Sequence, residues 1–393
     1  MSDLYRDDLL TGFNDLNNKD FLFLSSSKSL LARGQYAVVS KPLDDAVNPD
    51  SLIQQEIRQL FQQAKSDGIE NPVLVGAIPF DKQQNAALFV PKQCNWFQRQ
   101  QFPSLVSNST YTEKKRYQWP DKAHFSQMVN TAVDAMRNHA LDKVVLARLL
   151  DIETHQPLDS IQLLRHLNQQ NGWCYNFHVP LENGALIGAS PELLVRKQGN
   201  TIFSQPLAGS AKRSENQEED YKLRQALIQS VKDNYEHRLV TDMIRNVLES
   251  RCQKLHISNM PSTISTPVLW HLATDIEGEL KAPQENALSA ACLLHPTPAL
   301  CGTPYQTAKN LIEKLEPFKR NLFGGIVGWC DAKGDGEWVV TIRCGEVNAS
   351  RVRLFAGAGI VPDSNPESEW QETEVKFSTM LRAFEFSQEA CTA

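Results

Sequence analysis

A stretch near the carboxyl end of the chain, Ser364 to Phe384, constrains the fold most, because it combines a helical period with repeated acidic side chains. Read as a helix, it stacks Glu369, Glu372 and Lys376 on one face. The apolar residues fall on a different face, which we expect to pack against the core: Trp370, Phe377, Leu381 and Phe384. Two glutamates one turn apart repel each other unless water or a cation offsets their charge. The acidic face is therefore either a solvated surface or part of a cation-binding site.

A second helical stretch, predicted from about Glu218 to Arg251, carries a carboxylate within an apolar stripe. The carboxylate is Glu236, and the stripe consists of Val240, Met243 and Val247. Burying an ionised carboxylate without a partner is costly, so Glu236 should be protonated, paired with a cation or bound to a metal. Oxygen ligands from separate helices favour Mg²⁺. The alternative is a salt bridge, to Arg238 or to a lysine.

Composition and charge argue against several classes of function. The 393 residues are 41% hydrophobic and 22% charged, which is ordinary for a globular protein. The net charge is −6 and no basic cluster exceeds a short pair, so we expect no nucleic-acid partner. The first ten residues, MSDLYRDDLL, lack the apolar run of a signal peptide, and no stretch has the roughly 20 apolar residues that span a membrane. Eight scattered cysteines fit a reduced compartment, so we expect a cytoplasmic protein without membrane contact.

Turn signals predict the fold class. Glu182-Asn-Gly184 and Gly199-Asn200 each separate two apolar runs, as is typical of β-hairpins. Single strands and helices do not alternate, so the class is α+β, with antiparallel sheets covered by helices. Residues 1–110 mix strand and helix patterns, and the polar stretch from Arg99 to Lys122 is the best candidate linker to residues 111–393. We expect the two parts to form one integrated domain.

Two residues at strand ends are candidates for acid–base chemistry. Lys143 opens a strand whose same face is apolar, and a desolvated lysine is suited to act as a base. The alternative is a lysine that extends to water. Glu192 follows the turn Gly188-Ala-Ser-Pro191, and an apolar setting would raise its pKa and make it a general acid. The alternative is an exposed glutamate on a turn.

Other residues suit a small anionic ligand. Arg343 shares a predicted strand face with Thr341 and Val339, where it would bind a substrate carboxylate or form a structural ion pair. The small-residue turns Pro206 to Ala211 and Ala356 to Gly359 let backbone N–H groups approach an anion. The chain has no Walker A, dinucleotide, G-x-S-x-G or H-E-x-x-H motif. The residues alone therefore indicate a Mg²⁺-dependent enzyme that acts on a small carboxylate.

Ten motifs, in order along the chain, resemble those of the chorismate-utilising enzymes: LDKVVLARL, GASPELLVRK, PLAGSAKR, YEHRLVTDMI, WHLAT, LLHPTPALCG, LFGGIVGW, WVVTIRC, LFAGAGIV and EWQETEVK. The resemblance begins near Phe21 and is strongest to isochorismate synthases of the catechol-siderophore, enterobactin-type branch. It implies one α+β domain with two large antiparallel sheets packed together and helices outside. It also implies a Mg²⁺-dependent, reversible conversion of chorismate to isochorismate in a cleft between the sheets.

The resemblance also implies a role for each candidate residue. Lys143 would activate the water that attacks C2, and Glu192 would protonate the departing C4 hydroxyl. Glu236 and Glu372 would hold Mg²⁺, with Glu369 helping directly or through water. The remaining positions implied to bind substrate are Gly209, Ser210, His271, Thr274, Ala299, Leu300, Arg343, Gly357 and Lys376.

Two positions distinguish the branches of the family. Aminodeoxychorismate synthases carry a nucleophilic lysine where this chain has Ala208, and salicylate synthases tend to have Thr-Ala in place of Ala299-Leu300. Both positions favour an enzyme that stops at isochorismate, on the way to 2,3-dihydroxybenzoate. The alternatives are a menaquinone-pathway isochorismate synthase, a salicylate synthase or a non-enzymatic chorismate-binding relative. We expect a monomer that takes chorismate as its small-molecule substrate and needs no glutaminase subunit.

Overall fold

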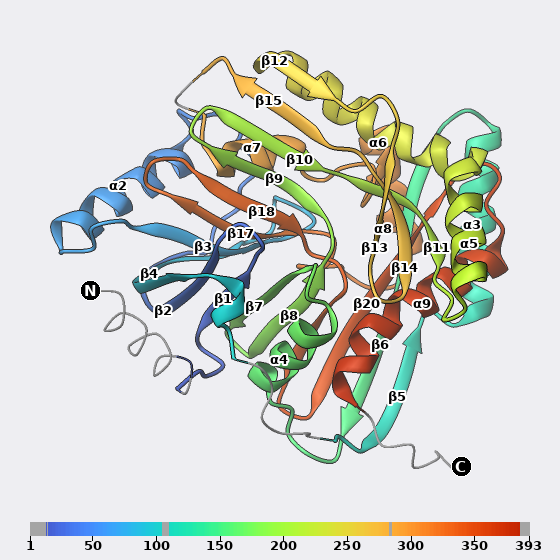
Figure 1. Cartoon of the computed structure of the whole chain (residues 1–393), viewed down its shortest axis with the longest axis horizontal. Helices are drawn as coiled ribbons and strands as arrows, with labels where there is room; N and C mark the ends of the chain where they lie inside the picture. Colours follow the sequence, from blue (N-terminus) through green and yellow to red (C-terminus); the bar gives the residue numbers. More distant parts are fainter. Residues whose placement is uncertain (1–12, 14, 104–109, 283–284, 386–393) are drawn as a thin grey trace.

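The computed structural model describes residues 13, 15–103, 110–282 and 285–385 (Figure 1). The acidic first ten residues of the chain lie outside the described residues. The α-helices are α2 (Leu52–Ser66), α3 (Lys122–Arg137), α4 (Ser160–Gln170), α5 (Gln217–Gln229), α6 (Val231–Glu249), α7 (Ala287–Leu294), α8 (Tyr305–Leu315) and α9 (Pro366–Phe384). The strands of the first half of the chain are β1 (Phe21–Leu24), β2 (Ser29–Val39), β3 (Val73–Ile78), β4 (Ala87–Phe97), β5 (Glu113–Trp119), β6 (Lys143–Thr154), β7 (Tyr175–Leu181), β8 (Gly184–Ser190) and β9 (Leu193–Gln198). The later strands are β10 (Thr201–Gln205), β11 (Leu207–Lys212), β12 (Cys252–Ile257), β13 (Ser262–Ser265), β14 (Leu269–Ala273), β15 (Ile276–Leu280), β16 (Gly302–Thr303), β17 (Ile326–Asp331), β18 (Gly336–Val340), β19 (Cys344–Asn348) and β20 (Arg351–Ile360).

The strands form one long antiparallel sheet and one small one. Seventeen strands pair in the order β5–β6–β20–β19–β8–β7–β1–β2–β4–β3–β17–β18–β9–β10–β15–β12, with β16 beside β6. Strands β13, β14 and β11 form a separate three-stranded sheet. This arrangement confirms the α+β class with antiparallel sheets.

The two halves of the long sheet face each other across a shared apolar core, and β1 and β2 join them. The core cluster combines residues of β6 and β20 with residues of β3, β17 and β18: Ala147, Leu149, Phe355, Val75, Val327 and Val339. Strand β6 is buried on both faces, since Val144 and Leu146 pack outward against helices α3 and α8. Residues of β6 therefore belong to the clusters on both of its faces, and the strand also begins with Lys143, the candidate base.

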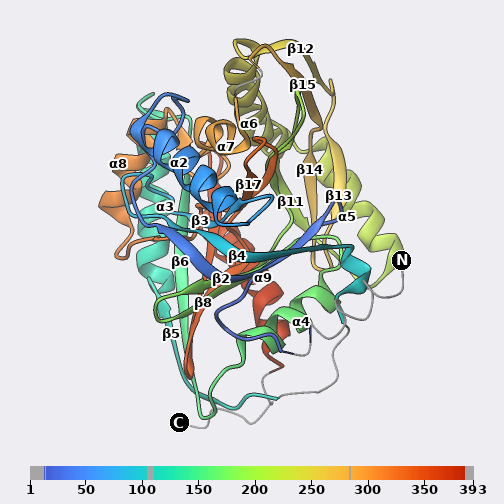
Figure 2. The ribbon, with the colours of Figure 1, turned by 90° about the vertical axis from the view of Figure 1, so that its left-hand side faces the viewer.

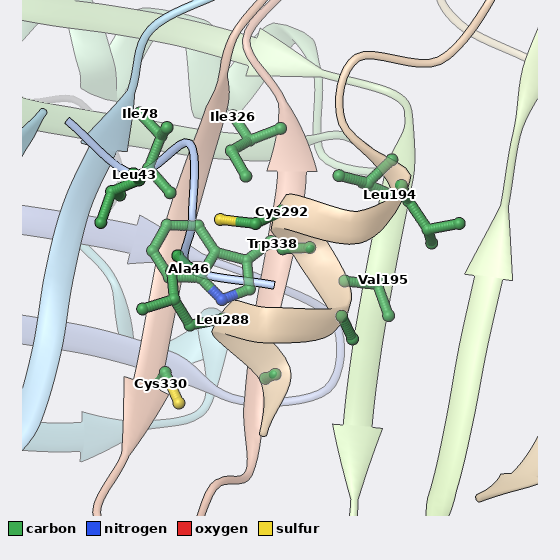
Figure 3. Close-up of a cluster of buried hydrophobic side chains, with 14 of the residues drawn as sticks. Leu43, Ala46, Ile78, Leu194, Val195, Leu288, Cys292, Ile326, Cys330 and Trp338 are labelled. Carbon is green, nitrogen blue, oxygen red and sulfur yellow. The ribbon is translucent and has the colours of Figure 1, made fainter. Parts of the chain in front are cut away.

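Helices cover the outer faces of both halves. Trp338 of β18 lies in a cluster with Leu288 and Cys292 of α7 (Figure 3). In the side view of Figure 2, α4 and α9 lie at the opposite end of the strands from α2, α7 and α8. Helix α9 packs on β20 and on α3, so its acidic residues are fixed relative to the long sheet. None of the helices in the described ranges has the length and apolar character needed to cross a membrane.

The single long helix predicted from about Glu218 to Arg251 is wrong. The chain forms two helices, α5 and α6, which meet at Ser230. The Ser230 backbone is extended (φ −65°, ψ 117°), and its hydroxyl accepts a hydrogen bond from the Asp233 N–H at 3.1 Å. A serine that caps the second helix breaks the first, because the cap needs a non-helical backbone. The break begins α6 shortly before Glu236 and sets the direction of that side chain.

Candidate active site

Most of the predicted site residues line one pocket. It lies where β20, the β8–β9 turn, the segment between β18 and β19, the small sheet and helices α6 and α9 meet. The predicted residues among its walls are Glu192, Gly209, Ser210, Glu236, His271, Ala299, Leu300, Arg343, Gly357, Glu372 and Lys376. Three other predicted residues, Lys143, Glu369 and Thr274, lie behind the lining. Residues that are spread over most of the sequence are thus brought together.

Lys143, the first residue of β6, is fully buried, so the alternative of a lysine extending to water is wrong. Its Nζ lies 2.8 Å from Glu236 Oε1. The close approach depends on Gly359 of β20, because a Cβ there would lie 2.1 Å from Glu236 Oε1 and 3.2 Å from Lys143 Cε. The structure thus pairs Glu236 with a lysine, and the lysine is the candidate base.

Glu192 lies on the turn between β8 and β9 and is 3% exposed, so the alternative of an exposed glutamate is wrong. The Ser190 hydroxyl accepts a hydrogen bond from its backbone N–H, and the Leu207 N–H donates to its Oε1 at 3.5 Å. Burial raises the pKa of the Glu192 carboxyl to about 7, although the positive charges of Lys143 and Arg343 act to lower it. A carboxyl with this pKa can hold a proton near neutral pH and release it.

Arg343 does not lie on a strand, so its predicted face-sharing with Thr341 and Val339 is wrong. Strand β18 ends at Val340, and β19 begins only at Cys344. Between them the Ile342 N–H donates to the Val340 carbonyl, and Arg343 has φ 50°. The alternation of side chains along a strand therefore does not extend to this residue.

This irregular segment is where the chain crosses from one half of the long sheet to the other. Strand β18 pairs with β17 and β9, whereas β19 pairs with β20 and β8. The crossing turns the buried Arg343 side chain toward the pocket. Burial lowers the pKa of Arg343, and the charges of Glu372 and Glu192 act in the opposite direction. A guanidinium between the two halves is placed to receive a carboxylate.

Helix α9 supplies the acidic wall of the pocket. Asn365 caps the helix, and its side chain accepts from the N–H groups of Glu367 and Ser368. Lys376 Nζ lies 2.5 Å from Glu372 Oε1 and donates to the Gly357 carbonyl at 2.7 Å. Burial raises the pKa of Glu372, but Lys376 outweighs it and the net pKa is lowered. Glu372 is therefore held as an anion.

Glu369, one turn earlier, is buried and pairs with Lys232 of α6 at 2.6 Å. Burial and the neighbouring charge of Glu372 raise the pKa of Glu369 to about 7. The predicted repulsion between the two glutamates is therefore present, and a lysine partly offsets it. Lys232 was not among the predicted residues, although its position one turn before Glu236 on the same helix was a usable signal.

The fit of these carboxylates to a metal ion is partial. Over residues 13, 15–103, 110–282 and 285–385, no three His, Cys, Asp or Glu side chains are arranged as a metal-binding group. Each of the three predicted ligands is paired with a lysine: Glu236 with Lys143, Glu369 with Lys232 and Glu372 with Lys376. However, Glu236 and Glu372 line the same pocket from different helices and offer only oxygen atoms, which is the donor chemistry that Mg²⁺ prefers.

The small sheet carries the opposite wall. His271 of β14 pairs in register with Ser210 of β11 and is buried. Burial lowers the pKa of His271 well below its ordinary value, so the ring is neutral. Its Nε2 has no hydrogen-bond partner among the described residues. A neutral imidazole nitrogen at the pocket wall can exchange a hydrogen bond with a ligand.

Thr274 has a supporting position rather than one in the pocket lining. Its hydroxyl contacts His237 Nε2 at 2.7 Å, and His237 Nδ1 lies 3.2 Å from the Ala208 carbonyl. The next residue, Gly209, has φ 78°, and a Cβ there would lie 2.9 Å from Asp233 Cβ. Thr274 and His237 thus hold the Gly209 turn from behind. His237 directly follows Glu236, but a buried histidine has no distinct sequence pattern, so the residue was not predicted.

Comparisons with known proteins cover nearly the whole chain. The family described as chorismate binding enzyme matches residues 81–385. Isochorismate synthase EntC of Escherichia coli strain K12 is 49% identical over 369 residues, which cover 93% of this chain and 94% of EntC. Isochorismate synthase DhbC of Bacillus subtilis strain 168 is 40% identical over 374 residues, which cover 92% of this chain and 93% of DhbC. A crystal structure described as a 2,3-dihydroxybenzoate-specific isochorismate synthase, DhbC from Bacillus anthracis, matches with a TM-score of 0.89 at 38% identity, covering 97% of this chain and 100% of that chain. The family match includes every residue that lines the pocket.

Proposed function

Because the chain belongs to the chorismate-binding enzyme family, we propose that it is an isochorismate synthase, which interconverts chorismate and isochorismate. The observation that carries this proposal is the pairing of two groups at one pocket. Lys143 supplies a buried amine, and Glu192 supplies a buried carboxyl whose pKa is about 7. An isomerisation that removes a hydroxyl from one ring carbon and adds water at another needs an acid and a base together.

The two groups divide the proton transfers between them. Lys143 must first lose to solvent the proton that it holds in the ion pair with Glu236. As a neutral amine, it then takes a proton from the water that forms a bond to C2. Glu192 gives its proton to the C4 hydroxyl, which leaves as water when the C4–O bond breaks. One water enters and one leaves, so atoms and charge balance. The protonated Glu192 is available for this step because burial disfavours its anion.

Cationic and backbone groups position the two carboxylates of the substrate. We propose that Arg343 and the backbone at Gly209 and Gly357 receive the enolpyruvyl carboxylate. Lys376, Ser210 and His271 would complete the walls around the ring, and Thr274 would act through His237. The burial of Arg343 supports this role, since a guanidinium shielded from water binds an anion more strongly.

We also propose Mg²⁺ as the cofactor. Glu236 and Glu372 would hold the ion, with Glu369 helping directly or through water. When bound, Mg²⁺ supplies positive charge that grips the ring carboxylate. The protein residues would then exchange partners, because each of these carboxylates is paired with a lysine in the structure.

Neighbouring residues favour isochorismate as the final product. Ala208 lines the pocket and offers no amine for covalent attack at C2. Ala299 and Leu300 line it as well, in the loop where salicylate synthases tend to carry Thr-Ala. The similarity to DhbC, described as specific for 2,3-dihydroxybenzoate, favours that siderophore branch over menaquinone synthesis. The scattered cysteines favour a cytoplasmic location, where we propose that the chain works as a monomer without a glutaminase subunit.

The test is to incubate the purified chain with chorismate and Mg²⁺ and to separate the products by chromatography. We expect an equilibrium mixture of chorismate and isochorismate, with no release of pyruvate. Salicylate and pyruvate as the main products would replace the proposal with a lyase. Absence of turnover, with chorismate still bound, would indicate a non-enzymatic relative.

A further inference from the structure

The strand that begins with the candidate base also carries a buried arginine on its other face. Lys143 shares a strand face with Val145, which lines the pocket, whereas Arg148 of the same strand, β6, is 0% exposed and contacts helix α9. We propose that Arg148 is a positioning residue, which fixes the rotation of α9 and thereby sets Glu372 and Lys376 in the pocket. The inference rests on the proposed function for its kinetic test and on the structure alone for its geometric test.

Arg148 contacts three residues that form one stripe along α9. Its guanidinium carbon lies 3.3 Å from the centre of the Trp370 ring and 5.2 Å from that of Phe377. Its Nη2 forms an ion pair with Glu374. These three residues are spaced i, i+4 and i+7, so they form one stripe over about two turns. A single planar side chain thus contacts the helix at successive turns and restricts its rotation.

The pocket side of α9 lies about 150° around the helix from this stripe, at roughly 100° per residue. Glu372 and Lys376 are on that side, and Lys376 reaches the Gly357 carbonyl at 2.7 Å. The ends of side chains lie about 5–6 Å from a helix axis, so a rotation of about 20° would move them by roughly 2 Å. A displacement of that size breaks a hydrogen bond. The position of Lys376 therefore depends on the contacts that Arg148 makes.

An apolar residue would fill the same space without the cost of burying a charge. Burial lowers the pKa of the Arg148 guanidinium, although Glu374 opposes the shift. Its Nε and Nη1 have no hydrogen-bond partner among the described residues. The Glu374 side chain is 43% exposed, so the ion pair offsets only part of the cost of burying the guanidinium, and stability alone does not explain this arginine. Its flat stacking on Trp370, together with the ion pair, is a geometry that lysine cannot reproduce.

The experiment compares Arg148→Met and Arg148→Lys with a matched control, Arg165→Met. Arg165 also lies over an aromatic ring, Phe102 at 5.4 Å, and donates to the Phe13 carbonyl at 3.0 Å. It belongs to helix α4, which packs on α9, but its own partners Phe102 and Phe13 lie outside α9, so it reports the loss of a similar stacked cation that does not contact α9. For each folded variant, kcat and KM for chorismate are measured well below its unfolding temperature.

We expect both Arg148 variants to raise KM about tenfold, equivalent to one misplaced charge-assisted hydrogen bond, with a smaller change in kcat. Arg165→Met should lower thermal stability and leave KM unchanged. A crystal structure of Arg148→Met should show α9 rotated, with Lys376 Nζ too far from the Gly357 carbonyl to donate a hydrogen bond. An unchanged KM with α9 in place would overturn the inference, as would full rescue by Arg148→Lys.

Two further outcomes keep the tests separate. If Arg148→Met fails to fold, Trp370→Leu removes the stacking surface and should raise KM in the same direction. An unaltered KM in that folded variant would count against the inference. If the wild-type chain does not convert chorismate, the proposed function fails, and the crystal structure of the variant still decides whether Arg148 positions α9.

Discussion

Two carboxyl groups in the same pocket, the buried Glu192 and the half-buried Glu372, have pKa values that are shifted in opposite directions. Glu192 lies on a turn between strands, where no cation of the described residues forms an ion pair with it, and burial raises its pKa to about 7. Glu372 lies on helix α9, and there Lys376 outweighs burial, so its pKa is lowered. Burial thus raises the pKa of one carboxyl, and an adjacent lysine lowers the pKa of the other. Such a pair can supply an acid and an anionic ligand to one substrate.

Removing the metal should have the largest effect on turnover. It tests whether the anionic glutamates, Glu372 among them, act as metal ligands. We expect that chelation with EDTA abolishes turnover and that an excess of Mg²⁺ restores it. The physical reason is that Glu236, Glu369 and Glu372 would be left with only lysine partners, and nothing would hold the ring carboxylate. The measurement is isochorismate formation before and after chelation. Activity that survives thorough chelation would contradict the assignment of these glutamates to a metal.

Replacing the base should have the next largest effect on turnover. Lys143→Ala removes the amine that takes a proton from water, and we expect kcat to fall by about 10²–10⁴ while the chain stays folded. The cavity left by the lysine lies next to Glu236, so the thermal stability of the variant must be measured in parallel. A folded variant with wild-type turnover would remove Lys143 from the mechanism.

Replacing Glu192 tests the proposed general acid directly. Glu192→Gln keeps the size of the side chain but cannot release a proton to the C4 hydroxyl, so we expect kcat to fall by about 10²–10³. In the wild type, activity should decline as the pH rises above about 7, because the Glu192 carboxyl then ionises. Rates measured from about pH 6 to about pH 9 check both statements. A pH profile that stays flat across this range would exclude Glu192 as the acid.

The same comparison explains which parts of the site could be predicted from the sequence. Glu372 and Lys376 are four residues apart on one helix, so helical spacing alone brought them together. The setting of Glu192 was predicted from its place after a Ser-Pro turn, and the structure confirms a raised pKa.

The direction of the Arg343 side chain and the pairing of Lys232 with Glu369 could not be predicted in the same way. The arginine lies where the chain crosses between the two halves of the sheet, and that crossing depends on pairings with β8 and β9, which are distant in sequence. Lys232 meets Glu369 from a different helix, 137 residues away. Local periodicity describes contacts within one element, whereas contacts between elements depend on the assembled fold.

The smallest expected effect is on stability, and it has opposite signs for the two carboxyls. Glu192 has a folded-state pKa above its unfolded value, so the folded state binds more protons between pH 4.5 and about 7. Its contribution to stability is present below pH 4.5 and is lost as the pH rises through about 7. The full difference is about 3 kcal/mol for a shift of this size.

Glu192→Gln removes this titration. The variant should therefore gain stability relative to the wild type between about pH 5 and about pH 8, by about 3 kcal/mol at most. Glu372 has a lowered pKa, so its contribution is present above its unfolded pKa and is lost on acidification. Glu372→Gln should accordingly be less stable than the wild type above the unfolded pKa of the carboxyl, and this difference in the free energy of unfolding should disappear at low pH. Urea unfolding of the three proteins measures the Glu192 difference over this pH range and the Glu372 difference below pH 4.5. Parallel stability curves for Glu192→Gln and the wild type would show that Glu192 ionises normally in the folded protein, and the contrast between the two carboxyls would then disappear.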